Sequence, residues 1–458
     1  MAQYRDEGND RGRGQGRGQG RRQGAGKGRR QGRGQSQGHS RDRREDQNRV
    51  PRRNQVLAGI DVVIDRGGSD ASGAAYSEAD TALAGKRLGL ITNPTGVTKS
   101  LEATLDVLHR DERFRLAAAF GPEHGLRGEA QDAVHIGDFH DESTGVMVYS
   151  LYGPNRRPTA DALASLDALV FDIQDVGVRF YTYISTMLLS MRACAEAGKE
   201  FIVLDRPNPI SGNLVEGGIL DERFTSFVGA CPVPVRHGLT AGELAVWANE
   251  TLGIGCRLTV CKMTGWRRAM WADETDLPWV MPSPNIPSLD TATVYPGACF
   301  VEGTNLSEGR GTTRPFELIG APWVDGPALA DRLNDMGLAG CRFRPVFFEP
   351  SCSKHVGEVC GGVQIHVLDR DVFRPVRTGV YILATIHELY PDQFQWIGTP
   401  EQQAAGRLHI DLLAGTDELR RTLDLGGYGR GIDDLLTKWE ADAERFEAER
   451  EQFVLYRS

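Results

Sequence analysis

The sequence lacks the patterns that mark several large classes of protein. Its 458 residues contain no apolar run of about 18 residues, so no transmembrane helix is expected. No apolar segment of the secretory type follows the first residues, which favours a cytoplasmic location without excluding export. Eight cysteines lie scattered without a Cys-x-x-Cys spacing. They are therefore interpreted as free thiols rather than as a disulfide framework or a zinc site.

Common fingerprints of cofactor binding and hydrolysis are also missing. No Gly-x-x-x-x-Gly-Lys-Ser/Thr loop is present, and no Gly-x-Gly-x-x-Gly follows the first predicted strand. The ten histidines include no His-Glu-x-x-His and no short His-x-His pair, and a Gly-x-Ser-x-Gly elbow is lacking. We therefore expect no cofactor, no metal and no serine nucleophile.

Charge is divided unevenly along the chain. Residues 1–53 hold 16 Lys/Arg against 6 Asp/Glu, whereas the rest of the chain holds 37 against 56. The first segment repeats Gly, Arg and Gln without apolar periodicity, so a disordered tail is expected there. It is interpreted as a solubilising extension, with a tether for RNA or an anionic surface as the alternative. The acidic remainder is expected to bind no nucleic acid.

Short apolar runs alternate with helical patterns from about residue 86 onward. Helices are predicted at residues 184–195 and at 240–252, where Thr240 and Glu243 form a capping box. The order predicts an α/β fold, namely a Rossmann-like, mainly parallel sheet with helices on both faces. Ligands of such sheets bind beyond the carboxyl ends of the strands. The predicted strands are residues 88–92, 116–120, 146–151, 168–173, 201–204 and 258–261.

A proline-rich segment at residues 278–297 suggests a crossing into a second domain. The predicted organisation is a tail at 1–53, a Rossmann-like domain at 54–285 and a smaller α+β C-terminal domain at 286–458. The last of these is expected to close a cleft.

The strongest local motif is Gly121-Pro122-Glu123-His124-Gly125, at the end of a predicted strand. It places a carboxyl group beside an imidazole on a tight turn. Hydrolysis of a glycosidic bond needs a proton donor for the leaving oxygen, and a carboxylic acid is the usual donor. Glu123 is the candidate donor. The alternative is a structural turn in which Glu123 pairs with Arg127.

A second polar stretch follows the strand at 168–173. It supplies acids, an amide, a guanidinium and phenols within one strand-to-helix turn, a mixture suited to sugar hydroxyls and to the apolar face of a sugar ring. Asp172 alternates into the strand as a buried acid, which makes Asp175 the better ligand candidate. An ordinary capped helix start is the alternative. The other candidates here are Gln174, Arg179, Tyr181 and Tyr183.

Two further segments carry polar candidates. Arg206 and Asn208 follow the strand at 201–204, and an arginine can bind a carboxylate with two hydrogen bonds. Arg206 could equally pair with Asp205 or Asp175 as part of the scaffold. The Gly-rich stretch at 302–313 contributes Glu302, Asn305, Glu308 and Arg310.

Taken together, these motifs resemble the exo-β-N-acetylmuramidase family, which is glycoside hydrolase family 171. The resemblance runs from about residue 57 to the end of the chain. It rests on residues 90–96, 121–125, 172–183, 204–209, 227–229, 236–238, 282–285 and 302–313.

The resemblance implies hydrolysis of terminal, non-reducing β-1,4-linked N-acetylmuramic acid (MurNAc) from fragments such as MurNAc-GlcNAc, in peptidoglycan turnover and cell-wall recycling. It assigns Glu123 as catalytic, with His124 and Asp175 beside it. Asp175, Glu302 and Glu308 stay open as the second catalytic group, and the substrate's own N-acetyl group could act as nucleophile. The alternative is a non-catalytic protein that binds cell-wall sugars or nucleotides. The implied substrate-binding residues are Asn93, Arg127, Gln174, Arg179, Tyr181, Tyr183, Arg206, Asn208, Asn285, Glu302, Asn305, Glu308 and Arg310.

Overall fold

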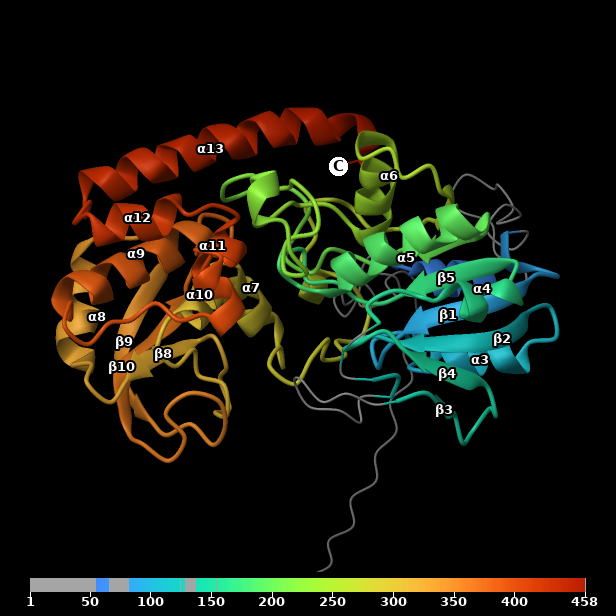
Figure 1. Ribbon diagram of the computed structural model, residues 1–458, viewed down its shortest axis with the longest axis horizontal. Coiled ribbons are helices and arrows are strands. Elements are labelled where there is room, and N and C mark those ends of the chain that lie inside the picture. Colours follow the sequence, from blue (N-terminus) through green and yellow to red (C-terminus); the bar gives the residue numbers. More distant parts are fainter. Residues whose placement is uncertain (1–54, 66–81, 124, 128–136, 154, 458) are drawn as a thin grey trace, which may run out of the picture. The chain divides into compact units, whose positions relative to one another are not determined.

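The computed structural model describes residues 55–65, 82–123, 125–127, 137–153 and 155–457. Residues 52–458 cluster into one compact unit (Figure 1). The predicted tail and the candidate His124 lie outside the described residues.

A seven-stranded sheet forms the first half of this unit, with the order β3-β4-β2-β1-β5-β6-β7. Every neighbouring pair is parallel except β3 with β4, so the mainly parallel sheet is confirmed. The central strands are near-continuous apolar runs, as expected for strands covered on both faces. The strands are β1 Arg87–Thr92, β2 Arg115–Gly121, β3 Phe139–His140, β4 Met147–Ser150, β5 Ala168–Asp172, β6 Glu200–Leu204 and β7 Arg257–Cys261.

Successive residues of these strands belong to two different hydrophobic cores. Leu169 and Phe171 of β5 pack in the core that contains α4, α5 and α6, whereas Val170 between them packs in the core that contains α1 and α3. Since neighbouring strand residues point to opposite faces, helices cover both faces, as predicted. These helices are α1 Gly59–Ile64, α3 Thr104–Arg110, α4 Ala160–Ala164, α5 Tyr183–Ala197 and α6 Ala241–Thr251.

The second half contains a smaller antiparallel sheet of order β8-β10-β9, which confirms the smaller α+β part. Whether a domain boundary falls at residues 285–286 stays a prediction. The strands are β8 Leu318–Ala321, β9 Cys341–Phe348 and β10 Cys360–Val367. The helices are α7 Leu289–Ala298, α8 Gly326–Asp335, α9 Pro375–Leu389, α10 Pro400–Ala404, α11 His409–Ala414, α12 Glu418–Asp424 and α13 Arg430–Arg450.

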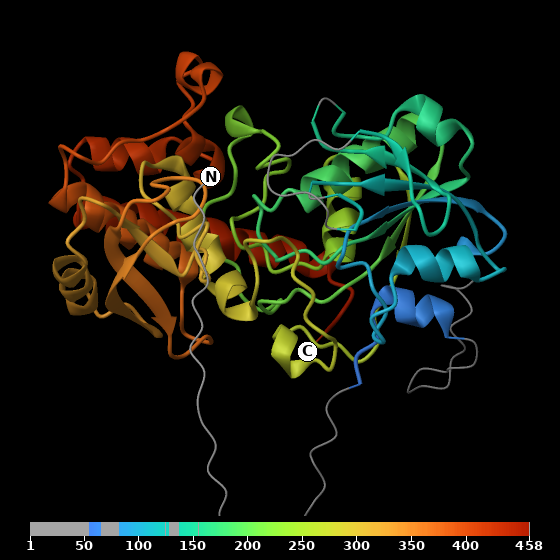
Figure 2. The ribbon, with the colours of Figure 1, turned by 90° about the horizontal axis from the view of Figure 1, so that it is seen from below.

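Helix α13 connects the two halves (Figures 1 and 2). It begins over α12 and ends beside α6, where Phe446 packs edge-on against Trp247 with ring centroids 5.8 Å apart. Arg450 at its end donates hydrogen bonds to the carbonyl oxygens of His237 (3.0 Å) and Gly238 (2.7 Å). The C-terminal helix therefore holds a loop of the first half in place. In the part of the chain that the structure describes, no helix has the length and apolarity needed to cross a membrane.

Candidate active site

Several candidate residues lie where the strand order of the sheet reverses. From β1 the chain proceeds to β2 on one side, and β5 pairs with β1 on the other, so the loops after β1 and β5 flank the topological switch point. The backbone N–H of Gln174 donates to Thr95 Oγ1 at 2.9 Å, and Thr95 Oγ1 donates to Asn93 Oδ1 at 2.5 Å. Asn93 therefore holds Thr95, which connects the loop after β1 to the loop after β5.

Glu123 lies two residues beyond the end of β2 and is partly exposed. Its Oε2 accepts a hydrogen bond of 3.1 Å from the hydroxyl of Thr182, the residue before α5. The guanidinium of Arg127 instead pairs with Asp106 (2.8 Å) and Asp141 (2.7 Å). The hydrogen bonds from Arg127 lower the pKa of Asp141 to about 2. Arg127 thus has two acidic partners close to the candidate donor.

Asp175 is buried in the turn after β5. Its Oδ2 accepts a 2.6 Å hydrogen bond from the backbone N–H of Gly177, whose φ of 77° few residues other than glycine adopt. Its Oδ1 is buried and has no hydrogen-bond partner among the described residues. Burial raises the pKa of Asp175 to about 7. A carboxyl group with so perturbed a pKa near a second, more exposed carboxyl is typical of catalytic sites.

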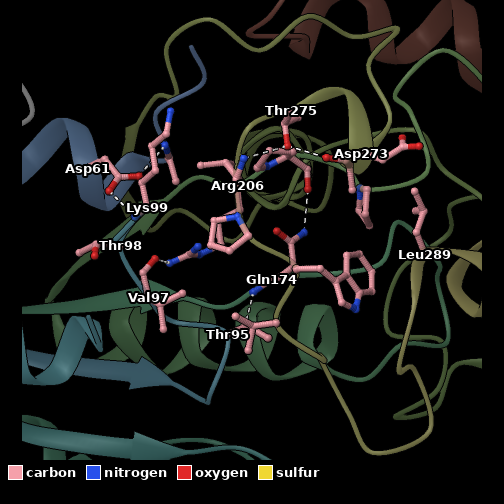
Figure 3. Close-up of a pocket in the computed structure, with 18 of the residues that line it drawn as sticks. Asp61, Thr95, Val97, Thr98, Lys99, Gln174, Arg206, Asp273, Thr275 and Leu289 are labelled. Carbon is pink, nitrogen blue, oxygen red and sulfur yellow. Dashed lines mark hydrogen bonds between the residues drawn. The ribbon is translucent and has the colours of Figure 1, made fainter. Parts of the chain in front are cut away.

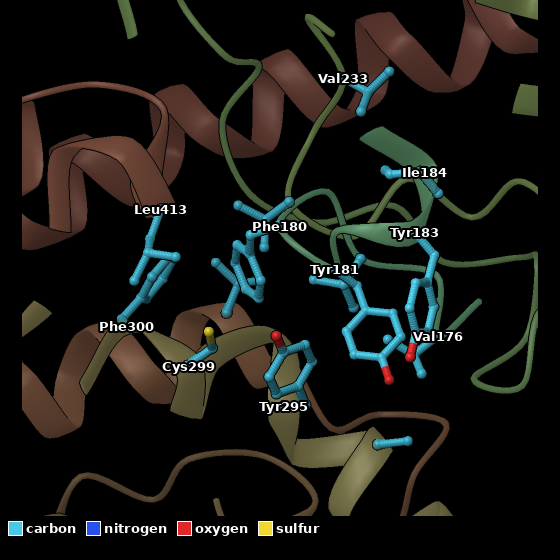
Figure 4. Close-up of a cluster of buried hydrophobic side chains, with 14 of the residues drawn as sticks. Val176, Phe180, Tyr181, Tyr183, Ile184, Val233, Tyr295, Cys299, Phe300 and Leu413 are labelled. Atoms are coloured by element: carbon cyan, nitrogen blue, oxygen red, sulfur yellow. The ribbon is translucent and has the colours of Figure 1, made fainter. Parts of the chain in front are cut away.

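Aromatic rings link this turn to the second half of the chain (Figure 4). Tyr181 stacks edge-on with Tyr183 at 5.0 Å and with Tyr295 at 5.8 Å, and Tyr295 stacks with Phe316 at 4.8 Å. Burial raises the pKa of Tyr181 well above its usual range, and both Asp175 and Glu123 act on it electrostatically in the same direction. Tyr183 donates a 2.7 Å hydrogen bond to the Pro282 carbonyl, so it holds the 282–285 segment, which contains the half-buried Asn285.

Charged residues of the Gly-rich segment form a cluster beyond Phe316. Arg310 lies over the Phe316 ring and pairs with Glu302 at 2.6 Å and Glu308 at 3.2 Å. Lys354 also pairs with Glu308, at 2.8 Å. Burial alone would raise the pKa of Glu302, but the charges of Arg310 and His409 outweigh it and the pKa is lowered. Glu302 is therefore ionised and forms an ion pair with Arg310, whereas the pKa of Asp175 is raised.

The other two candidate arginines bind protein groups. Arg206 donates two hydrogen bonds to Asp172, at 2.6 and 2.9 Å, and a third to the carbonyl of Val97. The carboxylate that its guanidinium binds is thus Asp172, whereas Asp205 accepts a hydrogen bond from the Arg206 backbone N–H at 3.0 Å. Arg179 is fully buried and donates to the carbonyl oxygens of Gly218, Val233 and Leu413, the last of which belongs to α11. Burial lowers the pKa of Arg179 to about 10.

Two candidate asparagines hold loops. The Asn208 amide donates to the Leu239 carbonyl at 3.0 Å and accepts from the Ile210 N–H at 3.2 Å. Asn305 likewise bonds to the backbone at Gln393 and Gln395, at 2.8 and 2.9 Å. Their amides are thus used to position neighbouring backbone.

A cavity of about 450 Å³ opens at the carboxyl ends of β1, β5 and β6 (Figure 3). The Gln174 side chain lies across it and donates to the carbonyls of Asp175 and Pro207, both at 2.7 Å. Arg206 and Trp279 also line it. The volume is within the range of about 300–1,000 Å³ that is typical of small-molecule sites, but Glu123 and Asp175 are not among the residues that line it.

The structure therefore brings Glu123, Asp175 and Tyr181 together and places Glu302, Glu308 and Arg310 in a second, neighbouring cluster. Thr182 and His237 are additional polar neighbours, which lie in motifs of the family resemblance but were not among the candidate site residues. Within the described ranges no group of three or more His, Cys, Asp or Glu side chains is arranged to hold a metal ion. The expected absence of a metal and of a cofactor stays a prediction.

Comparison with known proteins identifies the same family in both halves. The family model "Exo-beta-N-acetylmuramidase NamZ, N-terminal" matches residues 88–290, and its C-terminal counterpart matches residues 293–456. The chain is 44% identical over 412 residues to the peptidoglycan beta-N-acetylmuramidase NamZ of Bacillus subtilis. The matched region covers 90% of this chain and 94% of that protein.

Two crystal structures of DUF1343 family proteins from Bacteroides fragilis share the fold. One is 37% identical with a TM-score of 0.77, covering 88% of this chain and all of that one. The other is 30% identical with a TM-score of 0.66, covering 88% of this chain and 99% of that one.

Proposed function

Because the chain belongs to the exo-β-N-acetylmuramidase family, we propose that it hydrolyses terminal, non-reducing β-1,4-linked MurNAc from peptidoglycan fragments such as MurNAc-GlcNAc. The chain is a glycoside hydrolase. The observation that carries the assignment of its chemistry is the presence of two unlike carboxyl groups beyond the ends of β2 and β5, both of which act electrostatically on Tyr181. Glu123 is partly exposed and anchored by Thr182, whereas Asp175 is buried with a raised pKa.

In this proposal Glu123 protonates the glycosidic oxygen as the bond to the leaving sugar breaks. It is the more accessible of the two carboxyls, and the Thr182 hydroxyl fixes its orientation while leaving Oε1 to face the substrate. The buried Asp175 acts as the second group. It either takes part directly or orients the N-acetyl group of the substrate for attack on the anomeric carbon.

The lactyl carboxylate that distinguishes MurNAc from GlcNAc needs a cationic partner. Among Arg179, Arg206 and Arg310, the last is the best placed, because its side chain is 22% exposed, against 8% for Arg206. Arg310 also joins the aromatic series that leads through Phe316 and Tyr295 to the Glu123 site. We assign it the recognition of the lactyl group.

Incubation with purified MurNAc-GlcNAc tests the proposal. The expected result is release of free MurNAc and GlcNAc in equal amounts, and longer fragments should lose only the MurNAc at their non-reducing end, because the next sugar of the alternating chain is GlcNAc. Release of internal fragments, or turnover of β-GlcNAc glycosides at equal rates, would contradict it. The cytoplasmic location inferred from the sequence is likewise a proposal, to be checked by cell fractionation.

A further inference from the structure

His237 lies in a buried loop and faces Asp175. Its side chain is 1% exposed, and its Nδ1 accepts a 3.1 Å hydrogen bond from the backbone N–H of Leu239. A neutral imidazole with an accepting Nδ1 carries its proton on Nε2. Nε2 lies 4.0 Å from Asp175 Oδ2, so the nitrogen that carries the proton is a near neighbour of the carboxyl group.

Both members of this pair have an unused hydrogen-bonding atom. His237 Nε2 and Asp175 Oδ1 are buried, and neither has a hydrogen-bond partner within the described ranges. Buried polar atoms without partners are rare in native proteins and call for an explanation. Since a small movement of either side chain would bring donor and carboxylate to hydrogen-bonding distance, the pair is arranged for a contact that forms at a particular step.

The surroundings keep His237 neutral and its backbone fixed. Burial, together with the charges of the nearby Arg450, Arg179 and Arg268, lowers its pKa to about 3. Arg450 holds the His237 carbonyl, and Arg268 donates to the neighbouring carbonyl of Gly238 at 2.5 Å. The imidazole therefore keeps one proton and one orientation over the pH range in which enzymes work.

The carboxyl group has a complementary environment. The backbone N–H of Gly177 donates to it, and its charge raises the pKa of the buried Tyr181 phenol, whose shift is caused first by burial. Asp175 Oδ1 is left without a donor among the described residues, and His237 Nε2 is a side-chain donor that lies 4.0 Å from Oδ2 of the same carboxyl group.

We propose that His237 is a positioning residue for Asp175: its Nε2–H donates to the carboxylate form of Asp175 and fixes that carboxylate toward the substrate. The inference rests on the proposed function, because it concerns the second carboxyl of the same site. No proton is transferred from the imidazole. The Asp175 proton leaves to solvent or substrate, and His237 stabilises the charge that remains.

Two substitutions separate this role from simple packing. In His237→Asn the amide oxygen can replace Nδ1 as acceptor for the Leu239 N–H, but the side chain is too short to reach Asp175. In His237→Gln the longer side chain places an amide N–H near the position of Nε2. His387→Gln is the control, since His387 is a partly buried histidine that hydrogen-bonds to Tyr428 in the second half.

The measurements are kcat, KM and the pH profile on a chromogenic β-MurNAc glycoside, together with the melting temperature. We expect His237→Asn to lower kcat about tenfold or more, with a smaller change in KM, because a hydrogen bond to a charged group is lost. The pH-profile limb that reports Asp175 should move to higher pH, since its carboxylate is no longer stabilised. His237→Gln should retain most of the wild-type kcat and the wild-type position of the pH-profile limb that reports Asp175. His387→Gln should leave kcat and the pH profile unchanged.

Equal kcat and pH profiles in the wild type and in a folded His237→Asn protein would overturn the inference. So would equal losses in the Asn and Gln variants. If the wild type itself fails to turn over β-MurNAc glycosides, the proposed function fails instead. The pKa of Asp175 can then still be compared between the wild type and His237→Asn by measuring how the free energy of unfolding depends on pH.

Discussion

At the scale of single residues, the candidate arginines differ in what they already bind. The guanidinium of Arg179 donates to three backbone carbonyl oxygens, and that of Arg206 is held by Asp172. Sequence could place each arginine at a polar strand end or in a Gly-rich turn. It could not name their partners, because Arg179 bonds to Leu413, which is 234 residues away in the chain.

The first prediction concerns the recognition of MurNAc. Arg310→Ala should reduce kcat/KM for β-MurNAc glycosides by roughly 5- to 150-fold, because a charge-assisted contact of about 1–3 kcal/mol is lost. Hydrolysis of β-GlcNAc glycosides should change little, and the ratio of the two rates is the measurement. Arg179→Ala is the matched control, since it should lower the melting temperature rather than this ratio. A ratio unaffected by Arg310→Ala would assign the lactyl group to other residues.

At the scale of elements, the strands and helices with strong apolar patterns could be predicted, and short or irregular ones could not. The five residues of β5 are all buried, and the capping box of Thr240 and Glu243 forms as expected. The missed elements include β3, which has two residues, and β8, which depends on pairing with β10. Helix α7 was not predicted, because its segment is rich in proline and Pro296 lies within the helix itself.

The second prediction concerns the turn that presents Asp175. A Cβ added at Gly177 would lie 2.5 Å from the side chain of Asn208, at a φ that L-residues rarely adopt. Gly177→Ala should therefore lower the free energy of unfolding by about 1–3 kcal/mol. It should also reduce kcat, because the N–H that holds Asp175 moves. Denaturant unfolding and initial rates check it, with Gly198→Ala after α5 as a control that has strain but nothing within 4 Å of the added Cβ. Equal effects of the two substitutions on kcat would refute the special role of this turn.

At the scale of the whole molecule, fold and family could be predicted because long motifs are spread over both halves of the chain. The contacts that the site residues make with distant segments of the chain could not be predicted. His237 was part of a motif in the resemblance, but its contact with Asp175 depends on how the 236–238 loop is held by Arg450 from α13.

The third prediction concerns stability and pH. The pKa of Asp175 is about 7 in the folded protein and 3.8 without burial, so between these values the folded state keeps a proton that the unfolded state has lost. Stability therefore falls as pH rises through this window, by at most about 4 kcal/mol for this group. Asp175→Asn should reduce the loss of stability between pH 5 and pH 8. Buried Glu216 and Asp205, with pKa values of about 7 and 6, should leave part of the decline in place. A pH dependence identical to that of the wild type would show that Asp175 is ionised throughout.

The fourth prediction concerns residues 1–53. This segment has no apolar periodicity that would anchor it near the site. A protein that starts at residue 54 should match the full chain in kcat and KM on small substrates. A severalfold change in kcat would show that the segment reaches the active site.

The most direct test of the account is the leaving-group dependence of Glu123→Gln. A proton donor matters when the departing oxygen is a sugar alkoxide and matters little when the leaving group is an activated phenolate. The variant should therefore lose on the order of 10²–10⁴-fold in rate on MurNAc-GlcNAc. It should lose far less on an activated aryl β-MurNAc glycoside, with an unchanged melting temperature. Equal losses on both substrates, or wild-type turnover of the disaccharide, would contradict the assignment of Glu123 as the acid of a muramidase.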